Sequence, residues 1–386
     1  MNEGRATCFL PATGGLRGAV TVPGDKSVSH RALLLGAVND GPVVVRGFLR
    51  SADTAATLAA VRALGVQVDE LPLGELVVQG RGWEGLREPE DVIDVANSGT
   101  LIRLLPGLVA SCPFLCVFTG DASIRRRPMR RILDPLSRMG AVVAGRAQDS
   151  LAPFSIRGGA LHGMCHRLGV ASAQVKSCLL LAGLRAEGQT TVVEPGLSRD
   201  HTERLISHAG ATVLREADAA GGWRITVRAV DSLHLSEVRV PGDFSSAAFL
   251  LVAALLVPGS EVVVENVGLN PTRIGLVNVL QRMGAELTVE VTDDSGPEPS
   301  GRITSRTSRL VATEIGPEEI PNVIDELPVL LLAAGRAEGV SRVSGAAELR
   351  AKESDRLHAM SSLLSGLGLQ VRESEDGMEV VGEPGG

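Results

Sequence analysis

The chain repeats one pattern of apolar and polar positions five times. In each copy an apolar helical stretch and a β-rich run precede a second helical stretch, which ends at a glycine before another β-like run. Glycine is the residue that most readily takes the positive φ at a helix end. The five glycines at these ends are Gly65, Gly140, Gly210, Gly284 and Gly368. Each copy therefore predicts β-α-β-α-β-β over about 70 to 80 residues.

The first helix of each copy is predicted from an apolar run. These runs cover 29–38, 100–111, 174–187, 245–256 and 328–338. Pro106 and Gly107 fall inside the second run, so we expect that helix to kink or end there. The β-rich runs beside the helices are VVVRGF, LVVQG, TTVVEP, EVVVENV and VSRVSGA.

A second repeat divides the copies into two groups. PGDKS at 23–27 returns as PGDFS at 241–245, three copies later, and 386 residues exceed one core of usual size. We predict a mixed α/β fold of two domains, each planned as three βαβαββ units. The first domain is expected over 22–240, and the second over 1–21 together with 241–386. Only five units are found, so we expect the sixth, C-terminal unit to be missing.

Lysine is rare, and each lysine lies in a polar motif. The chain has three lysines among 38 basic residues, and they are Lys26 in PGDKSVSHR, Lys176 in SAQVKS and Lys352 in LRAKESDR. A lysine can release its proton where an arginine stays charged, so these positions are candidates for function.

Composition excludes several classes of protein. The chain has no tyrosine, two tryptophans and a net charge of −7, which argues against nucleic-acid binding. The five cysteines lack metal-ligand spacing, and Cys112 and Cys116 lie among apolar residues as expected for buried thiols. The N-terminal segment has no leader pattern, and no apolar run is long enough to span a membrane. We expect a soluble cytoplasmic protein.

The polar motifs fall where first helices begin: KSVSHR, NSGT, SAQ, GDFSS and DELP. Helix N-termini attract anions, although capping alone would explain Ser245 and Asn97. Capping does not explain Lys26 and Arg31 in a first turn, where the helix dipole disfavours cations. The five arginines of 125–131 form either a solvated face or part of an anion site. If the helix starts converge, the cations Lys26, Arg31, Arg103, Arg127, Lys352 and Arg356 predict a cleft for phosphates and carboxylates.

Two carboxylates among these cations are candidates for proton transfer. Asp325 precedes a helix start, and Glu353 follows Lys352 directly. One could act as general base and the other as proton donor if their surroundings separate their pKa values. An equally simple interpretation is that Glu353 and Arg356 pair as helix neighbours.

These motifs together resemble the enolpyruvyl transferases, and most closely the 5-enolpyruvylshikimate-3-phosphate (EPSP) synthases. The matching segments are PGDKSVSHRALLLGA, NSGTLIR, GDASIRRRPM, SAQVKS, PGDFSSAAF, IDELP and LRAKESDRL, which span 23–357. The resemblance implies a two-domain inside-out α/β barrel of βαβαββ units. It implies transfer of the enolpyruvyl group of phosphoenolpyruvate to the 5-hydroxyl of shikimate 3-phosphate, by a monomer with no metal or organic cofactor.

The resemblance also implies roles for individual residues. Asp325 would take the proton of the attacking hydroxyl, while Glu353 and Lys26 would handle the protonation of the enol methylene and of the leaving phosphate. The expected shikimate 3-phosphate site is Lys26, Ser27, Arg31, Ser172, Ala173, Gln174, Ser198, Arg199, Asp325 and Lys352. The expected phosphoenolpyruvate site is Lys26, Asn97, Gly99, Arg127, Gln174 and Arg356. Cations crowding Lys26 are expected to lower its pKa.

The sequence departs from the family pattern at several positions. The family's later DHR segment and a further basic residue are absent, and this gap coincides with the expected missing unit. Glu348 and Ala173 replace residues that some members have as Asn and Ser, and Gly99 is the small residue expected against phosphoenolpyruvate. The alternatives are a chain that binds shikimate 3-phosphate without turnover and an enolpyruvyl transferase acting on a UDP-amino sugar.

Overall fold

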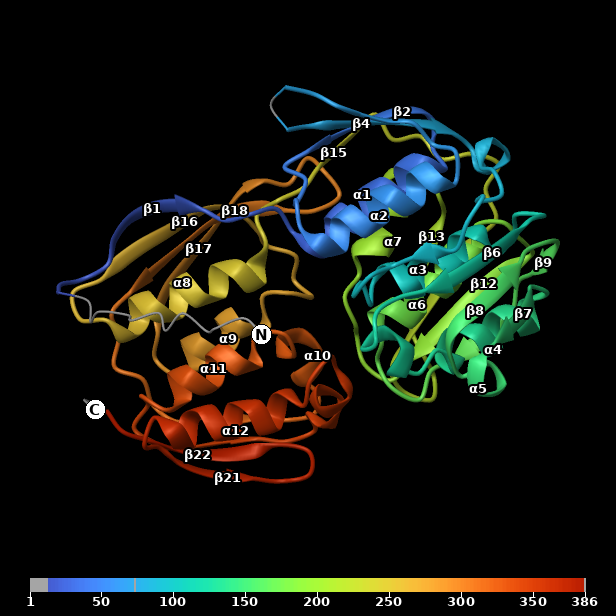
Figure 1. Cartoon of the computed structure of the whole chain (residues 1–386). Helices are drawn as coiled ribbons and strands as arrows, with labels where there is room; N and C mark the ends of the chain where they lie inside the picture. The colour runs from blue at the N-terminus through green and yellow to red at the C-terminus, as the bar shows by residue number, and fades with distance from the viewer. Residues whose placement is uncertain (1–12, 73, 385–386) are drawn as a thin grey trace, which may run out of the picture.

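The computed structural model of this chain describes residues 13–72 and 74–384. Its buried apolar side chains form two separate clusters, one between Val28 and Val240 and one between Phe244 and Val380. Figure 1 shows the corresponding two bodies side by side, with the N-terminal strand β1 (Arg17–Thr21) in the second body. We call them the first half and the second half. The boundaries of the two domains stay a prediction. The N-terminal segment in which the sequence shows no leader pattern, which includes Cys8, lies outside the described residues.

Five four-stranded sheets share one strand order. In each sheet the first and second strands of the order are parallel. The second and third strands are antiparallel, and so are the third and fourth. The orders are β15-β2-β4-β3, β5-β6-β8-β7, β10-β12-β14-β13, β1-β16-β18-β17 and β19-β20-β22-β21. The predicted mixed α/β fold and its five repeats are therefore confirmed.

The first half contains three repeats. The first has α1 (Lys26–Ala37), β2 (Asp40–Arg46), α2 (Ala52–Ala63), β3 (Val68–Glu70) and β4 (Leu76–Arg81), followed by the short helix η1 (Trp83–Gly85). The second has β5 (Ile93–Asp94), α3 (Leu101–Val109), β6 (Leu115–Thr119), η2 (Ile124–Arg126), α4 (Arg130–Met139), β7 (Val142–Gly145), α5 (Arg146–Asp149) and β8 (Leu151–Arg157). The third has β9 (Leu161–His162), β10 (Cys165–Arg167), α6 (Ala173–Gly183), β11 (Ala186–Glu187), β12 (Gln189–Glu194), α7 (His201–His208), β13 (Val213–Ala217), β14 (Trp223–Arg228) and, leading out, β15 (Glu237–Arg239).

The second half contains two repeats. The fourth repeat of the chain has α8 (Phe244–Leu256), β16 (Glu261–Gly268), α9 (Gly275–Arg282), β17 (Glu286–Asp293) and β18 (Ser300–Arg306), with β1 as its edge strand. The fifth has β19 (Glu314–Ile315), α10 (Ile320–Val323), α11 (Leu327–Ala334), β20 (Gly339–Val343), η3 (Ala347–Ala351), α12 (Arg356–Gly366), β21 (Gln370–Glu373) and β22 (Met378–Gly382). Within the described ranges no helix is long and apolar enough to cross a membrane.

The second helix of every repeat ends where the sequence predicts. The five glycines at these ends have φ between 83° and 119°, a conformation that a side chain disfavours. The helix that contains Pro106 and Gly107 does not end at these residues, because α3 continues to Val109. Gly107 instead permits close packing on α6, since a Cβ there would lie 2.1 Å from the carbonyl oxygen of Cys178.

The two PGD segments pair with each other where the chain crosses between the halves. The amide of Asp25 donates to Pro241 O, and the amide of Asp243 donates to Pro23 O, each at 2.8 Å. Gly24 and Gly242 form the bridge between them. A Cβ at Gly24 would lie 1.9 Å from the Gly47 carbonyl oxygen, which explains the glycine of this motif. Both crossings therefore lie at one place, beside the starts of α1 and α8.

Candidate active site

The predicted polar motifs do lie at helix starts, but two of the expected caps are different residues. Asp25 caps α1 by accepting from the Val28 amide, and Asp243 caps α8 by accepting from the Ser246 amide. Ser245, which capping alone was expected to explain, donates instead to Glu326. Asn97 likewise donates its amide hydrogen to Asp121, before the start of α3. These two polar side chains therefore connect neighbouring segments.

Several of these helix starts contact one another. The Lys26 amide, at the start of α1, lies 3.3 Å from an oxygen of Asp243, the cap of α8. The Gln174 side chain at the start of α6 donates to Thr100 Oγ1, the residue before α3, at 3.3 Å. The repeats thus bring positively polarised helix ends together in pairs, which favours bound anions.

Asp325, before α11 of the second half, collects cations from both halves. It accepts a hydrogen bond from Arg199 of the first half. Arg356 Nη1 lies 3.0 Å from Asp325 Oδ1, and Lys352 Nζ lies 4.0 Å from the same oxygen. The structure therefore brings four predicted site residues together around one carboxylate. We call Asp325, Arg199, Lys352 and Arg356 the Asp325 cluster.

The cations of the cluster determine the pKa of Asp325. Burial alone would raise it, but Arg199, Lys352 and Arg273 outweigh burial and hold the pKa well below its ordinary value of 3.8. Burial also lowers the pKa of Lys352, and the nearby guanidinium groups of Arg199 and Arg356 lower it further, against the opposing effect of Asp325. Asp325 is therefore ionised and available to accept a proton, although this arrangement makes it a weak base.

Glu353 extends this cluster toward the first half. Its carboxylate lies 2.8 Å from Arg356 Nη2 and 3.9 Å from Arg127 Nη2. Glu353 precedes α12, which begins at Arg356, so the pair is not formed within a helix as the simpler interpretation proposed. Burial would raise the pKa of Glu353, but hydrogen bonds and the charges of Arg356 and Arg127 lower it overall.

Arg127 lies next to Gly99, another residue of the predicted phosphoenolpyruvate site. A Cβ at Gly99 would lie 2.5 Å from Arg127 Nη1 and 3.2 Å from Arg103 Nη1, so two guanidinium groups approach this glycine closely. Arg103 also donates to Gln174 Oε1 at 2.9 Å. Burial and the neighbouring Arg127 lower the pKa of Arg103 to about 10. Gly99, Arg127 and Gln174 thus belong to one connected group.

Lys26 and Arg31 have other contacts than expected. Lys26 Nζ pairs with Asp53 Oδ2 at 3.1 Å, and its side chain is 46% exposed, so its nearest charge is an anion and not a group of cations. Arg31 is buried, and three of its five N–H groups donate to the Ser27 carbonyl, Thr202 and Ser177. Burial lowers the pKa of Arg31 to about 10.

The remaining predicted residues lie near the start of α6 and in the loop before α7. Ser172 is the residue before α6, makes no side-chain capping bond, and is followed by Ala173 as the first helical residue. The hydroxyl of Ser198 donates to Glu194 Oε2 at 2.5 Å. Lys176 lies beneath this loop, 1% exposed, and its ammonium donates to the Ser198 carbonyl at 3.2 Å.

Sequence reasoning missed Arg273 and did not assign a role to Glu326. Both are buried, and Arg273 Nη1 lies 3.3 Å from Glu326 Oε1. Burial would lower the pKa of Arg273, but Glu326, Asp25 and Asp325 raise it above its ordinary value. Burial raises the pKa of Glu326. The sequence around Arg273, NPTRIG, has no apolar pattern that would have indicated a buried ion pair.

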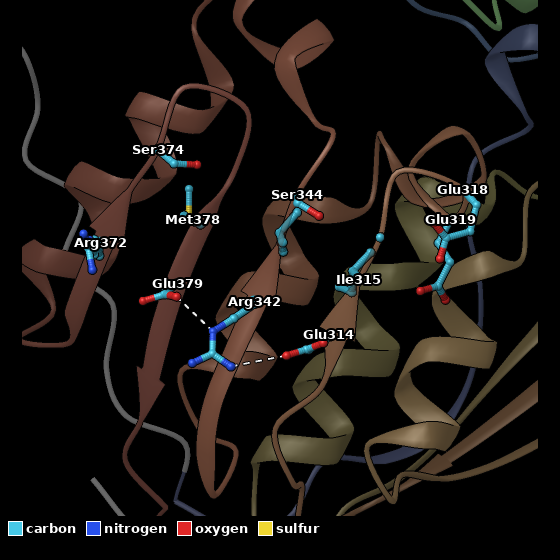
Figure 2. Close-up of a pocket in the computed structure, with 12 residues that line it drawn as sticks. Glu314, Ile315, Glu318, Glu319, Arg342, Ser344, Arg372, Ser374, Met378 and Glu379 are labelled. Carbon is cyan, nitrogen blue, oxygen red and sulfur yellow. Dashed lines mark hydrogen bonds and ion pairs between the residues drawn. The ribbon is translucent and has the colours of Figure 1, made fainter.

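A pocket of the second half lies away from this site. It measures about 610 Å³ and lies at the fifth sheet, lined by charged residues of β19, β20, β21 and β22 and of the segment before α10 (Figure 2). Its four glutamates outnumber its two arginines, and Arg342 is already paired with Glu314 and Glu379. An excess of carboxylates repels anionic ligands, so this pocket does not suit the predicted substrates.

A family model described as EPSP synthase (3-phosphoshikimate 1-carboxyvinyltransferase) matches residues 11–384. The chain belongs to the EPSP synthase family. It is 46% identical over 376 residues to the 3-phosphoshikimate 1-carboxyvinyltransferases of Bacillus thuringiensis (strain Al Hakam) and Bacillus cereus (strain ZK / E33L). Each alignment covers 97% of this chain and 86% of the relative.

Solved structures agree with this family. An EPSP synthase from Acinetobacter baumannii has a TM-score of 0.86 and 43% identity, covering 97% of this chain and 84% of that chain. The enolpyruvyl transferase NikO from Streptomyces tendae has a TM-score of 0.69 at 19% identity, covering 96% and 83%, and shows the shared fold alone. The predicted EPSP synthase resemblance is confirmed, and the UDP-amino-sugar alternative is not favoured.

Proposed function

We propose that this chain transfers the enolpyruvyl group of phosphoenolpyruvate to the 5-hydroxyl of shikimate 3-phosphate, releasing phosphate. The observation that supports this most directly is the Asp325 cluster, in which one carboxylate is surrounded by cations from both halves. Two substrates that each carry several negative charges repel each other in water. A cationic site between the halves offsets that repulsion and fixes the reacting atoms together.

We propose that Asp325 accepts the proton of the attacking hydroxyl. In the structure the nearby cations lower its pKa, which weakens it as a base. The phosphate of shikimate 3-phosphate would share the charge of Arg199 and Lys352. The pKa of Asp325 then rises toward the value at which proton transfer is efficient. Binding of the substrate thereby increases the basicity of the group that activates it.

We propose Glu353 and Lys26 as the proton donors, because bound substrate would change the charges around them as it does for Asp325. Arg356 and Arg127 lower the pKa of Glu353 here, and the anionic groups of phosphoenolpyruvate would offset both cations. Glu353 can then hold the proton that the enol methylene receives. Lys26 is proposed to serve the leaving phosphate, which requires its ammonium to leave Asp53 when substrates bind. Shikimate 3-phosphate is assigned to Lys26, Ser27, Arg31, Ser172, Ala173, Gln174, Ser198, Arg199, Asp325 and Lys352. Phosphoenolpyruvate is assigned to Lys26, Asn97, Gly99, Arg127, Gln174 and Arg356.

We propose that the enzyme works in the cytoplasm as a monomer. The four cysteines within the described residues are free thiols, as is usual in a reducing compartment. Burial raises the pKa of the Cys116 thiol to about 12, so it is not the reactive loop thiol of a UDP-amino-sugar transferase. The Asp325 cluster is assembled within a single chain, so a second copy is not needed to complete it.

The test is phosphate release from phosphoenolpyruvate by this chain, with and without shikimate 3-phosphate. We expect release only when both substrates are present. Absence of release would contradict the proposal for this chain. Calorimetric titration with shikimate 3-phosphate would then separate a chain that binds without turnover from one that does not bind.

A further inference from the structure

A second pocket, of about 500 Å³, lies in the first half between α4 and the segment that follows β10. Its lining includes four arginines and one acid, which are Arg130, Arg131, Arg138, Arg167 and Asp134. Leu168, Val170 and Val175 give it an apolar wall. It contains none of the four residues of the Asp325 cluster. Its composition therefore favours a small anion that also carries an apolar part.

Three of the four arginines already have acidic partners. Arg131 pairs with Glu348 of the second half at 2.9 Å, and Arg167 pairs with Asp218 at 3.0 Å. Arg130 lies 4.0 Å from Asp134. Arg138, in the last turn of α4, has no acidic group within ion-pair distance among the residues that the structure describes. Its charge is therefore available to a ligand.

A buried histidine lines the same pocket. His166 of β10 is 3% exposed, yet neither ring nitrogen has a hydrogen-bond partner within the described part of the chain. A buried polar group without a partner costs free energy, and such a group beside a hollow is commonly satisfied by something bound there. His166 and Arg138 thus provide two unused hydrogen-bonding groups from two different elements.

We propose that this pocket is a second anion site, which binds a small organic molecule through a carboxylate or phosphate group held between Arg138 and His166. An arginine fork matches both kinds of oxyanion, and an imidazolium can add a charged hydrogen bond. The apolar wall accommodates the rest of the ligand. Arg138 and His166, the two groups that carry this proposal, have no role in the proposed catalytic function, although Ser172 of the pocket lining is also assigned to shikimate 3-phosphate.

The electrostatics of His166 support this site and provide a way to observe it. Burial and then the positive charge of Arg138 lower the pKa of His166 to about 4. The charged groups that line the pocket come from α4 and β10, while Ser172, which precedes α6, and Val175 of α6 carry no charge. A bound anion between Arg138 and His166 offsets the effect of the Arg138 charge on the pKa of His166. Its binding would therefore raise the pKa of His166 and be coupled to uptake of a proton.

Two residues of the pocket lining also contact or belong to neighbouring parts of the molecule. Arg131 lines the pocket and is the first-half partner of Glu348, while Ser172 lines the pocket and precedes α6. Arg131 stays paired with Glu348 of the second half and is not one of the two groups that hold the proposed anion.

The experiment follows the His166 ring by nuclear magnetic resonance in the whole chain labelled with nitrogen-15 histidine, near pH 6. Inorganic phosphate and succinate are the two probes. We expect a saturable change of the His166 nitrogen signals toward imidazolium values with at least one probe, and the stronger probe identifies the preferred group. The Arg138→Gln variant should weaken this response at least about tenfold. Assignment uses the His166→Asn variant, or triple-resonance spectra if that variant does not fold.

Arg157→Gln is the matched control, since Arg157 is exposed and lies outside the pocket. It should leave the response unchanged. A lack of response to both probes in the unmodified chain would overturn the proposal. An undiminished response in Arg138→Gln would overturn it as well, because the signal would then report an anion bound elsewhere. Substrate-dependent phosphate release bears on the catalytic proposal alone.

Discussion

Two charge clusters of this protein differ in how they are balanced. Lys176, beneath the Ser198 loop, pairs with Glu194 at 2.8 Å and with Glu203 at 2.7 Å. Neighbouring pairs of Arg215 and Arg204 with Glu203 and Asp200 complete a set of three cations and three acids. Every charge in this set, which we call the Lys176 cluster, has an opposite partner.

The Asp325 cluster is unbalanced by comparison. Arg199, Lys352 and Arg356 surround one carboxylate, and Glu353 is shared between Arg356 and Arg127. The surplus is positive and is partly open to solvent. The comparison teaches that burial of charge alone does not mark a binding site. A balanced set supports the fold, whereas a set with surplus charge of one sign has capacity left for a ligand of the other sign.

The largest expected effect is on the chemical step. Asp325→Asn keeps the shape of the side chain but removes the proton acceptor, so kcat should fall by about 10² to 10⁴ while KM changes little. The measurement is steady-state phosphate release at saturating shikimate 3-phosphate. Asp294→Asn, an exposed acid of the same half, is the control and should keep full activity. An Asp325→Asn variant with normal kcat would remove the assigned role.

Substitution by methionine should mainly reduce stability at Lys176 and mainly weaken substrate binding at Lys352. Lys176→Met leaves the buried carboxylate of Glu194 without a cation and Glu203 with Arg215 alone, so the free energy of unfolding should drop by about 3 to 5 kcal/mol. Lys352→Met should change stability by less than about 1 kcal/mol, and it should raise KM for shikimate 3-phosphate about tenfold or more. Urea unfolding and steady-state kinetics on both variants test this. Equal losses of stability would invalidate the distinction between the clusters.

A smaller effect is expected at Gly99. The methyl group of Gly99→Ala would lie 2.5 Å from Arg127 Nη1, so the guanidinium must move away from the proposed phosphoenolpyruvate site. KM for phosphoenolpyruvate should rise about fivefold to tenfold, with KM for shikimate 3-phosphate nearly unchanged. Gly159→Ala is the matched control, because a Cβ there has no neighbour within 4 Å. A rise in both KM values would indicate a general disturbance.

The smallest effect concerns stability and pH. The folded state lowers the pKa of Asp325 below its ordinary value of 3.8, so the unfolded chain binds the proton more tightly. The contribution of this carboxylate is therefore complete above about pH 4 and is lost as pH falls through the folded-state pKa. The difference in unfolding free energy between the unmodified chain and Asp325→Asn should shrink below pH 4. A difference that grows on acidification would contradict the assigned direction.

The sequence predicted what depends on neighbouring residues in the chain. Helix ends at Gly65 or Gly368 and the start of α1 follow from local backbone preferences, and the repeat reveals the topology. Contacts between distant segments were not predictable in this way. Asp53 as partner of Lys26, and Glu326 as partner of Arg273, depend on how the repeats pack. Sequence motifs therefore identified the candidate site residues but not their partners.

The paired PGD segments have a consequence for how the molecule can be cut. The two crossings between the halves run side by side and are joined by hydrogen bonds from Asp25 to Pro241 and from Asp243 to Pro23. A protease that cleaves one crossing leaves the other strand intact and the pair still bonded. The chain would then behave as a nicked but undivided molecule. If the chain were divided near residue 241 and its two parts were expressed separately, they could reassociate through the paired PGD segments.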